Sequence, residues 1–588
     1  MRFRQDCVKI SVRVLPLQAI SPFTLKENNS LPFLFRPGNE SVIRSSSVKR
    51  SVQRKGKETI VMLDSILRGG TLIDGSGAPG VPADLAIQNG KIAAIGNCGG
   101  LEARRSFDVR GKCVTPGFLD IHRHADAAVF RPGFGEAELR QGLTTIINGN
   151  CGLSLAPFGK AHRAEILSYL RPITGAVTEE AETGSMDGYL RALSAQPLPL
   201  HVGMLVGGGT LRADCFGYDN APISDYAPLH RAMEKALAEG AFGVSLGLGY
   251  APECFYSTKA LIRALAPLQG SGIPITVHMR EEGSAVLSAI DEMLTVCRAL
   301  HTPVHISHLK AMGKENWGNK IPQALAMLRR AREDGLPVSC DVYPYTAGST
   351  QLLHILPQDF LGGGLDAVVQ RLRDPGARRE LSARLKTGTD FDNISRLVGW
   401  ENILLSTLNQ PENKRYEGKS VAEIAKQRGQ EPDACVFDLL ADEHCAITMI
   451  DFIASEQDIA QILQDDFANV ISDSTYPTEG MPHPRVYGTF ARMIEKYVCR
   501  DKVLSLEQAV RKMTQVPADV LGLRQKGRLV VGADADILVF APEAIRENAT
   551  YQKPCVCSDG FETVFVGGET AIENGRLTGS RSGSVLRR

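Results

Sequence analysis

The sequence predicts an α/β fold in which a (β/α)8 TIM-like barrel is combined with a small β-sandwich. The central part of the chain alternates short apolar strands with amphipathic helical patterns, and both ends are rich in short strands and turns. The length of 588 residues accommodates a barrel with additional segments. Lys+Arg and Asp+Glu each number 66, which argues against partners such as nucleic acid or an anionic membrane surface.

Residues 1–61 differ in composition from the rest of the chain. They are rich in Arg, Lys and Ser, poor in acidic residues, and lack the apolar segment of a secretory signal. A transit peptide has a similar composition, but we interpret residues 1–61 as a disordered or wrongly assigned extension, with the true start at Met62. The thirteen cysteines form no CxxC pair, which indicates a reducing compartment, so we expect a cytoplasmic protein.

Strand patterns occupy both ends of the remaining chain. Residues 62–116 contain "ADLAIQNGKIAAIG", in which an Asn-Gly pair separates two alternating runs. Residues 526–588 have the same character in "GRLVVGADADILVF" and "TVFVGGETAIENGRL". The two ends are therefore predicted to build one composite β-sandwich.

The region 117–525 is predicted to form the barrel. Its eight candidate strands are 117–122, 144–149, 201–206, 242–247, 273–278, 303–308, 337–343 and 468–473. Helical patterns follow most of them, including one that begins at an N-cap residue, Ser257. Residues 352–467 separate the seventh and eighth strands and are too many for an ordinary loop, so we predict an inserted subdomain there.

Chemically versatile side chains fall at the carboxyl ends of these strands, where barrel enzymes build their active sites. They are His122, His124, Cys151, His278, His308 and Asp473. A lone HxH pair arises by chance, and a lone cysteine is usually a small buried apolar residue. Five ligand-type residues at strand ends are harder to explain by packing, and imidazole with thiolate suits zinc, so the combination predicts a metal site.

Asp473 is predicted to act as a general base beside the metal, the alternative being a turn or helix-cap aspartate. His301 and His305 are interpreted as loop and strand-face residues. Counting by strand alternation from His308, we expect His305 to point away from the barrel interior.

Six motifs together resemble the N-acyl-D-amino-acid deacylases (D-aminoacylases) of the amidohydrolase superfamily. They are "VTPGFLDIHRHAD", "NGNCGLSLAP", "VHMREEG", "HISHLKAMGKENWG", "DVYPYTAGST" and "HPRVYGTFARM". The resemblance extends from about Met62 to the C-terminus. It implies a zinc-dependent enzyme that hydrolyses N-acyl-D-amino acids to a carboxylate and a free D-amino acid.

The resemblance also implies roles for individual residues. Cys151, His278 and His308 would hold a tightly bound zinc ion, while His122 and His124, with Cys151 bridging, would form a weaker second site. Asp473 would be the general acid/base. The substrate of such an enzyme carries a free carboxylate, and the positions expected to bind substrate are Arg485, Lys310, Tyr343, Ser349 and Tyr250.

Three departures from the family pattern leave the preferred amino acid open. Ala454 replaces the usual Met, "ISDS" (471–474) replaces "GSDG", and "TYPTEGM" (475–481) follows it. Two alternative functions are a hydrolase of cyclic amides or other N-acyl substrates, and an inactive barrel that only binds a ligand. Cyclic-amide hydrolases use a carboxylated Lys on the fourth strand, which "FGVSLGLGY" lacks. The oligomeric state is left open.

Overall fold

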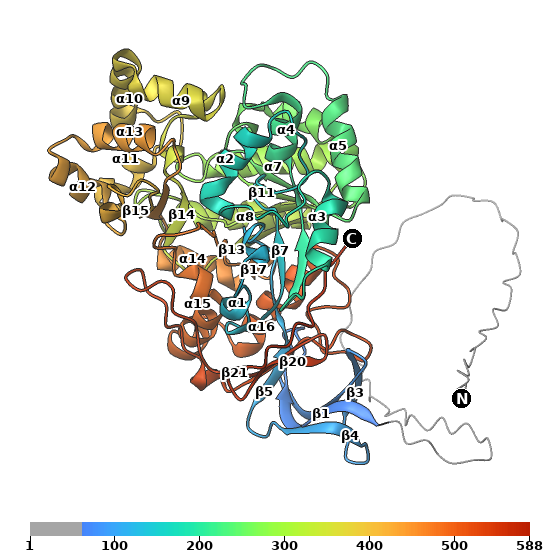
Figure 1. The fold of residues 1–588 in the computed structure, drawn as a ribbon. Coiled ribbons are helices and arrows are strands. Elements are labelled where there is room, and N and C mark those ends of the chain that lie inside the picture. The colour runs from blue at the N-terminus through green and yellow to red at the C-terminus, as the bar shows by residue number, and fades with distance from the viewer. Residues whose placement is uncertain (1–61) are drawn as a thin grey trace, which may run out of the picture. The chain divides into compact units, whose positions relative to one another are not determined.

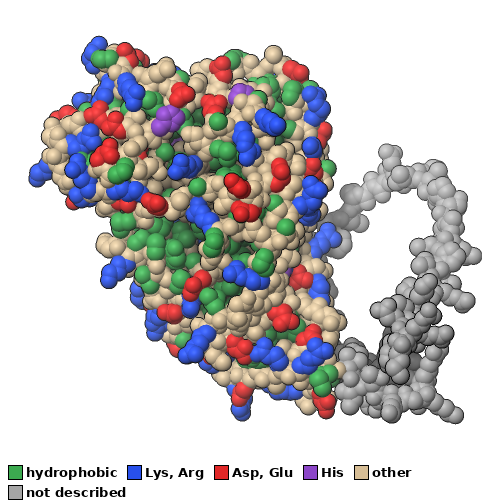
Figure 2. All heavy atoms as spheres, in the orientation of Figure 1, with side chains coloured by type: hydrophobic (Ala, Val, Ile, Leu, Met, Phe, Trp, Pro, Cys, Tyr) green, Lys and Arg blue, Asp and Glu red, His purple; other side chains and the backbone are tan. Residues whose placement is uncertain are grey.

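The computed structural model describes residues 62–588, so the predicted extension 1–61 lies outside the described residues. No helix within residues 62–588 is both long and apolar enough to cross a lipid bilayer. Figure 1 shows an α/β protein in which helices surround a central set of strands. On the face visible in Figure 2, acidic and basic side chains are interspersed.

All eight predicted central strands are present, most of them shorter than predicted. They are β6 (Phe118–Asp120), β7 (Leu143–Asn148), β8 (His201–Met204) with β9 (Val206–Gly207), β10 (Val244–Gly247), β11 (Ile275–His278), β12 (Val304–Ile306), β13 (Val338–Val342) and β17 (Ala468–Val470). Only Leu205 separates β8 from β9. The strands pair in parallel in two sheets, β6-β7-β8 and β17-β13-β12-β11-β10-β9. A parallel bridge between Arg123 and Ser474 joins the segments that follow β6 and β17.

Helices connect these strands and cover them. They are α1 (Glu136–Leu139), α2 (Arg163–Thr174), α3 (Met186–Ser194), α4 (Gly208–Phe216), α5 (Ala227–Ala238), α6 (Thr258–Ala264), α7 (Val286–Leu300), α8 (Lys320–Glu333), α15 (Arg485–Arg492), α16 (Leu506–Met513) and α17 (Gln515–Val520). The Ser257 cap is confirmed, because its hydroxyl accepts the Ala260 N–H at the start of α6. In α7 the apolar residues recur with helical spacing, and this stripe is buried.

Between β13 and β17 the chain forms additional structure, as the long separation predicts. Strands β14 (Ala347–Gln351), β15 (Ile403–Thr407) and β16 (Thr448–Phe452) form an antiparallel sheet in the order β14-β16-β15. The helices are α9 (Gly364–Arg373), α10 (Pro375–Thr387), α11 (Ile394–Val398), α12 (Val421–Arg428), α13 (Pro432–Asp442) and α14 (Glu456–Gln464). Helices α9–α13 lie together in Figure 1, coloured yellow to orange. Helix α14 instead packs on α8 and β17.

The strands at the two ends of the described chain share one nine-stranded sheet. They are β1 (Leu63–Leu72), β2 (Val81–Gln88), β3 (Lys91–Gly96), β4 (Ala103–Asp108), β5 (Cys113–Pro116), β18 (Ile537–Phe540), β19 (Phe561–Val566), β20 (Glu569–Glu573) and β21 (Arg576–Leu577). The two groups meet where β5 pairs antiparallel with β18. The turn between β2 and β3 is the predicted Asn89-Gly90 pair, and both residues have positive φ.

Short helical turns complete the secondary structure. The 3-10 turns are η1 (Ala128–Phe130), η2 (Glu253–Phe255), η3 (Ala266–Leu268), η4 (Leu352–Ile355), η5 (Gln358–Leu361), η6 (Trp400–Asn402), η7 (Lys414–Tyr416) and η9 (Pro542–Ala544), and the π-helix η8 (Met493–Arg500) continues α15. Buried apolar side chains within or directly beside several central strands meet one another, among them Ile147, Leu205 and Ile471. These contacts fix the strand ends from which the site is built.

Candidate functional site

The predicted ligand residues all lie at or just beyond the carboxyl ends of the central strands. His122 and His124 follow β6, Cys151 follows β7, His278 ends β11, and His308 follows β12. Because the strands are parallel, their ends meet on one side and these side chains converge. The sequence therefore identified residues that the fold brings together.

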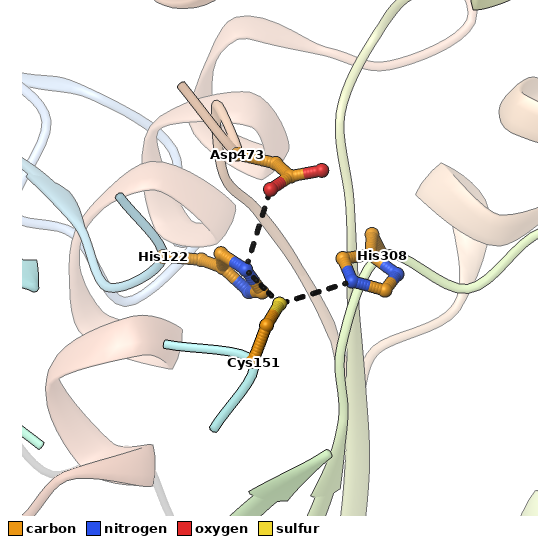
Figure 3. A group of neighbouring side chains, drawn as sticks. All are labelled: His122, Cys151, His308 and Asp473. Atoms are coloured by element: carbon orange, nitrogen blue, oxygen red, sulfur yellow. Dashed lines mark hydrogen bonds and ion pairs between the residues drawn. The ribbon is translucent and has the colours of Figure 1, made fainter. Parts of the chain in front are cut away.

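The donor atoms of these side chains are close neighbours (Figure 3). Cys151 Sγ lies 3.2 Å from His122 Nε2 and 3.5 Å from His308 Nε2. His308 Nε2 lies 3.1 Å from His278 Nδ1. One donor atom each from His122, Cys151, His308 and Asp473 falls within 4.8 Å of the others, and His278, Glu282 and His308 form a second such group. These separations allow several donors to share one metal ion.

Unusual backbone conformations turn three of these side chains inward. Cys151 has φ 53°, His308 φ 36° and Asp473 φ 52°. Non-glycine residues in the left-handed region each cost about 1–3 kcal/mol and concentrate at functional sites. The conformations of His308 and Asp473 explain why β12 and β17 end before the residues that were predicted to close them.

The chemistry of the donors fits zinc. Burial raises the pKa of the Cys151 thiol, but His122 and the other imidazoles lower it, and the net pKa lies well below its usual value. The thiolate is the ligand form of cysteine. His122, His124 and Cys151 are buried. Sulfur and imidazole nitrogen are the donors that zinc prefers, whereas magnesium and calcium prefer oxygen donors.

Asp473 stands beside this group of donors. Its Oδ1 lies 3.4 Å from Nε2 of both His122 and His124, and its Oδ2 lies 3.0 Å from Arg485 Nη1. Burial raises the pKa of Asp473, but the Arg485 guanidinium and the imidazoles lower it more, so the net pKa lies well below its usual range. The Asp473 N–H donates to the His122 carbonyl, which holds the backbone of the two residues together.

Glu282 contacts two of the predicted residues and was not identified from sequence. Its Oε1 lies 2.9 Å from His308 Nδ1, and its Oε2 accepts a 2.7 Å hydrogen bond from Lys310 Nζ. Burial raises the pKa of Glu282, but His278 and Lys310 lower it strongly. The ammonium of Lys310 therefore faces the metal-site carboxylate, and the motif "VHMREEG" was the only sequence signal for Glu282.

The expectation for His305 was wrong. His305 is buried and its Nε2 lies 2.9 Å from Asp341 Oδ2, while Asp341 reaches both His122 and His308. Strand β12 ends at Ile306, and the left-handed backbone of His308 interrupts the alternation from which the side-chain direction was counted. His301, as expected, lies outside the strands, at the C-cap of α7.

A cavity opens next to the metal-site residues. The expected substrate positions Tyr250, Lys310, Tyr343 and Ser349 line it, together with His124, Cys151, His278, His308 and Asp473. The Tyr250 ring stacks on the His278 ring, with 4.2 Å between the ring centres. The buried Tyr343 hydroxyl has no hydrogen-bond partner within residues 62–588.

Arg485 lies behind the lining of this cavity. Its Nη2 donates a 3.1 Å hydrogen bond to the Ser349 carbonyl, and its guanidinium carbon is 4.8 Å from the Tyr343 ring centre. The Nε and Nη1 atoms have no hydrogen-bond partner in the described part of the chain, although Nη1 faces Asp473. His354 also lines the cavity, with its ring centre 4.2 Å from that of Tyr250 and the two rings tilted by 44°, and no sequence pattern indicated this residue.

Known proteins with similar sequences and structures include three deacylases. A model described as "Amidohydrolase family" matches residues 422–572. The D-aminoacylase of Alcaligenes xylosoxydans xylosoxydans is 33% identical over 528 residues, which cover 89% of this chain and 98% of the relative. The N-acyl-D-glutamate deacylase of the same organism is 34% identical over 531 residues, which cover 90% and 97%.

A solved structure extends this similarity to the backbone. The N-acyl-D-glutamate deacylase of Bordetella bronchiseptica was solved with zinc and a phosphonate inhibitor that mimics the tetrahedral intermediate. It aligns with a TM-score of 0.76 at 31% identity, covering 90% of this chain and 100% of that chain. The similarity thus includes both the strands that carry the site and the terminal sheet.

Proposed function

The chain belongs to the N-acyl-D-amino-acid deacylase (D-aminoacylase) family of amidohydrolases, and we propose that it hydrolyses N-acyl-D-amino acids to a carboxylate and a free D-amino acid. The observation that carries this proposal is the convergence of Cys151, four imidazoles and Asp473 at the edge of one cavity. The reaction is hydrolysis of a carbon–nitrogen bond other than a peptide bond. The proposed binding partner of the protein is this small-molecule substrate.

The proposed metal ligands are those that the family resemblance implies, and the short Cys151–His308 and His308–His278 separations support the first set. Cys151, His278 and His308 would hold a tightly bound zinc ion, and His122 and His124 would form a second, weaker site with Cys151 as the bridge. Zinc in this position would supply a Lewis acid for the acyl carbonyl and a water molecule of lowered pKa.

Asp473 would carry the proton through the reaction. Its Oδ1 would accept a proton from the water that attacks the acyl carbon, and would return this proton to the amide nitrogen as the C–N bond breaks. Arg485 lies 3.0 Å from Oδ2 and favours the ionised carboxylate, which is the form that accepts a proton. One proton is thus taken from water and one is delivered to the leaving amine.

The free carboxylate of the substrate would be held by the residues expected from sequence. The Tyr343 hydroxyl and Arg485 Nε have no hydrogen-bond partner within residues 62–588 and are donors available for a new anion, whereas Arg485 Nη1 is already paired with Asp473 Oδ2 at 3.0 Å. Lys310, Ser349 and Tyr250 line the same cavity and would complete the binding site. A hydrogen bond from a buried donor to the substrate carboxylate contributes more binding free energy than the same bond at an exposed surface, where the carboxylate only displaces water.

The alternatives are less well supported. Strand β10 contains no Lys, so it offers no bridging carboxylated Lys for a hydrolase of cyclic amides. An inactive binding barrel would not need an aspartate that is held against two candidate ligand histidines. We therefore retain the deacylase function.

We propose that the central strands form a closed (β/α)8 barrel over residues 117–525. The parallel strand order and the Arg123–Ser474 bridge support closure. The shared terminal sheet supports a composite β-sandwich from residues 62–116 and 526–588, and the extra sheet and helices support an insertion over 352–467. The twelve described cysteines form no disulfide, which supports our proposal of a cytoplasmic location.

The test is amine release from paired N-acetyl-D- and N-acetyl-L-amino acids of Met, Leu, Phe, Glu and Asp by the zinc-loaded protein. We expect turnover of the D-series only, and the preferred side chain will define the pocket that the departures at Ala454 and 471–481 leave open. Asp473→Asn should retain zinc and lose turnover by about 10²–10⁴-fold, the usual contribution of a general acid/base. Wild-type turnover in Asp473→Asn, or no turnover of any D-substrate by zinc-loaded protein, would contradict the proposal.

A further inference from the structure

A Ser–His–Asp group, in which the histidine and the aspartate are buried, lies next to the candidate metal site; we call Ser339, His305 and Asp341 the Asp341 group. Ser339 Oγ lies 2.7 Å from His305 Nδ1, and His305 Nε2 lies 2.9 Å from Asp341 Oδ2. Neighbouring strands hold the three residues, because β12 and β13 pair His305 with Ser339. An ionised carboxylate only accepts hydrogen bonds, so His305 donates through Nε2–H and accepts the Ser339 hydroxyl at Nδ1.

The far side of Asp341 faces the residues that would bind metal. Its Oδ1 accepts the backbone N–H of His308, the residue with left-handed φ of 36°. Its carbonyl accepts the N–H of Leu309 at 2.8 Å, so Asp341 contacts the turn that carries His308 from two sides. Asp341 Oδ2 also lies 3.7 Å from Nδ1 of His122, whose Nε2 points toward Cys151.

Asp341 depends on His305 for its orientation. Apart from the 3.7 Å approach of His122, His305 is the only side chain within residues 62–588 that contacts the Asp341 carboxylate as a hydrogen-bond partner. Asp341 is 1% exposed, so loss of the His305 donor would leave a buried carboxylate with one hydrogen-bond partner fewer. Carboxylates that orient ligand histidines from behind typically change metal affinity by 10–100-fold when they are altered, so their own positioning matters.

We propose that His305 is a positioning residue of the metal centre, which acts by holding Asp341 in the orientation that fixes His122 and the His308 turn. This inference rests on the metal site of the proposed function. It assigns a role to a histidine that contacts neither the cavity beside the metal-site residues nor their donor atoms.

The molecule contains a matched control. His201, Ser584 and Asp536, the Asp536 group, have the same arrangement: His201 Nδ1 lies 2.7 Å from Ser584 Oγ, and His201 Nε2 lies 3.0 Å from Asp536 Oδ1. Asp536 contacts Lys526 and the Gly567 N–H instead of metal-site residues. Variants of His201 therefore report what the loss of such a histidine does to folding alone.

The His305 ring borders a cavity at the amino ends of the strands, so removal of the ring would open its position to this cavity. His305 and Ser339 line a cavity of about 820 Å³ that also contacts Pro274, Pro303 and Pro337, which precede β11, β12 and β13. Imidazole added to a His305→Ala variant therefore has a route to the position of the missing ring.

The experiment compares His305→Gln with His305→Asn, using zinc affinity from competition with a chelator as the readout. The glutamine amide nitrogen falls near imidazole Nε2 and keeps the donor to Asp341, whereas the asparagine amide nitrogen falls near Nδ1 and loses it. We expect His305→Asn to bind zinc about 10–100-fold more weakly, and His305→Gln to remain close to wild type. Equal, wild-type zinc affinity in both variants would overturn the proposal.

Two further measurements separate positioning from general destabilisation. His201→Asn should lower the midpoint of thermal unfolding without changing zinc affinity. Added imidazole should restore zinc binding to His305→Ala, and this measurement tests the proposal even if His305→Asn does not fold. A loss of zinc affinity in His201→Asn equal to that in His305→Asn, or no effect of imidazole on folded His305→Ala, would contradict the role of His305. A wild-type protein that binds no zinc would overturn the proposed metal site itself, and is distinguished from these results by its zinc content.

Discussion

The Asp341 and Asp536 groups use the same three types of side chain, with hydrogen-bond lengths that agree to within 0.1 Å, but their aspartates face different surroundings. Asp341 contacts the backbone of His308 and approaches His122. Asp536 accepts a 2.7 Å hydrogen bond from Lys526 Nζ and a 2.8 Å hydrogen bond from the Gly567 N–H. In both groups the histidine orients the aspartate carboxylate. The difference between the groups shows that the residue on the other side of the carboxylate determines whether the pair supports the metal site or the fold.

The position of the Asp536 group in the fold indicates a structural purpose. His201 begins β8, Asp536 immediately precedes β18, and Gly567 follows β19, so the group ties the terminal sheet to a central strand. Burial raises the pKa of Asp536, but His201 and Lys526 lower it, and the net pKa lies well below its usual range. The carboxylate is therefore ionised and paired in the folded protein.

The largest expected difference between the two groups is in folding stability. Asp536→Asn removes the charge that faces Lys526, and breaking a buried ion pair costs about 3–5 kcal/mol. We expect the lower end of this range because Lys526 keeps Asp534 at 3.0 Å. Urea unfolding measures the loss, while zinc affinity should not change.

Asp341→Asn is the reciprocal variant and should weaken zinc binding. Its amide oxygen can still accept one hydrogen bond, but the amide group cannot accept both the His308 N–H and the His305 N–H as the carboxylate does. If Asp536→Asn lost zinc as readily as Asp341→Asn, the distinction between the two groups would fail.

A smaller effect is expected in the pH dependence of the free energy of unfolding, which should differ between wild type and Asp536→Asn. The folded pKa of Asp536 is depressed below the unfolded value of about 3.9, so its stabilising contribution is fully present above that pH and is lost as the pH falls toward the folded pKa. The stability difference between wild type and Asp536→Asn should therefore narrow below pH 4, by about 1.4 kcal/mol per pH unit. Thermal unfolding between pH 6 and 3 measures it, and a gap that widens in acid would contradict the assignment.

The sequence was sufficient to predict the central strands and the residues that converge at their ends. Strand alternation, turn residues and ligand-type side chains such as His278 and Cys151 are local signals, and parallel strands place their carboxyl ends together. The terminal strands were also predictable as strands, because Asn-Gly turns such as Asn89-Gly90 mark hairpins. Each of these features is determined by a few residues that are close together in the sequence, so a local pattern is enough to predict it.

The remaining features depend on contacts that no local pattern contains. The direction of His305 was wrong because it was counted from His308, whose left-handed backbone cannot be predicted from strand periodicity. Asp341 and Glu282 acquire their roles only when neighbouring strands are in register. The partners in the Asp536 group are 335 and 383 residues from His201 in sequence, so only the folded chain brings them together.

The smallest expected difference concerns the serines at the other end of each histidine. Within residues 62–588, Ser339 Oγ is the only hydrogen-bond partner of His305 Nδ1, whereas His201 Nδ1 also accepts the backbone N–H of Ser584 at 3.1 Å. Ser339→Ala therefore removes this protein partner and frees the ring to change tautomer, which would direct a lone pair instead of an N–H toward Asp341.

Ser584→Ala keeps the backbone donor and the tautomer of His201. We expect Ser339→Ala to release zinc faster and to lose about 1 kcal/mol of stability, the typical net worth of one buried hydrogen bond, and Ser584→Ala to lose less and to keep wild-type zinc kinetics. Chelator-induced zinc release and urea unfolding of the two variants measure both quantities. Identical behaviour of the pair would mean that the tautomer of His305 is fixed by Asp341 alone, since the carboxylate would then hold the Nε2–H without help from Ser339.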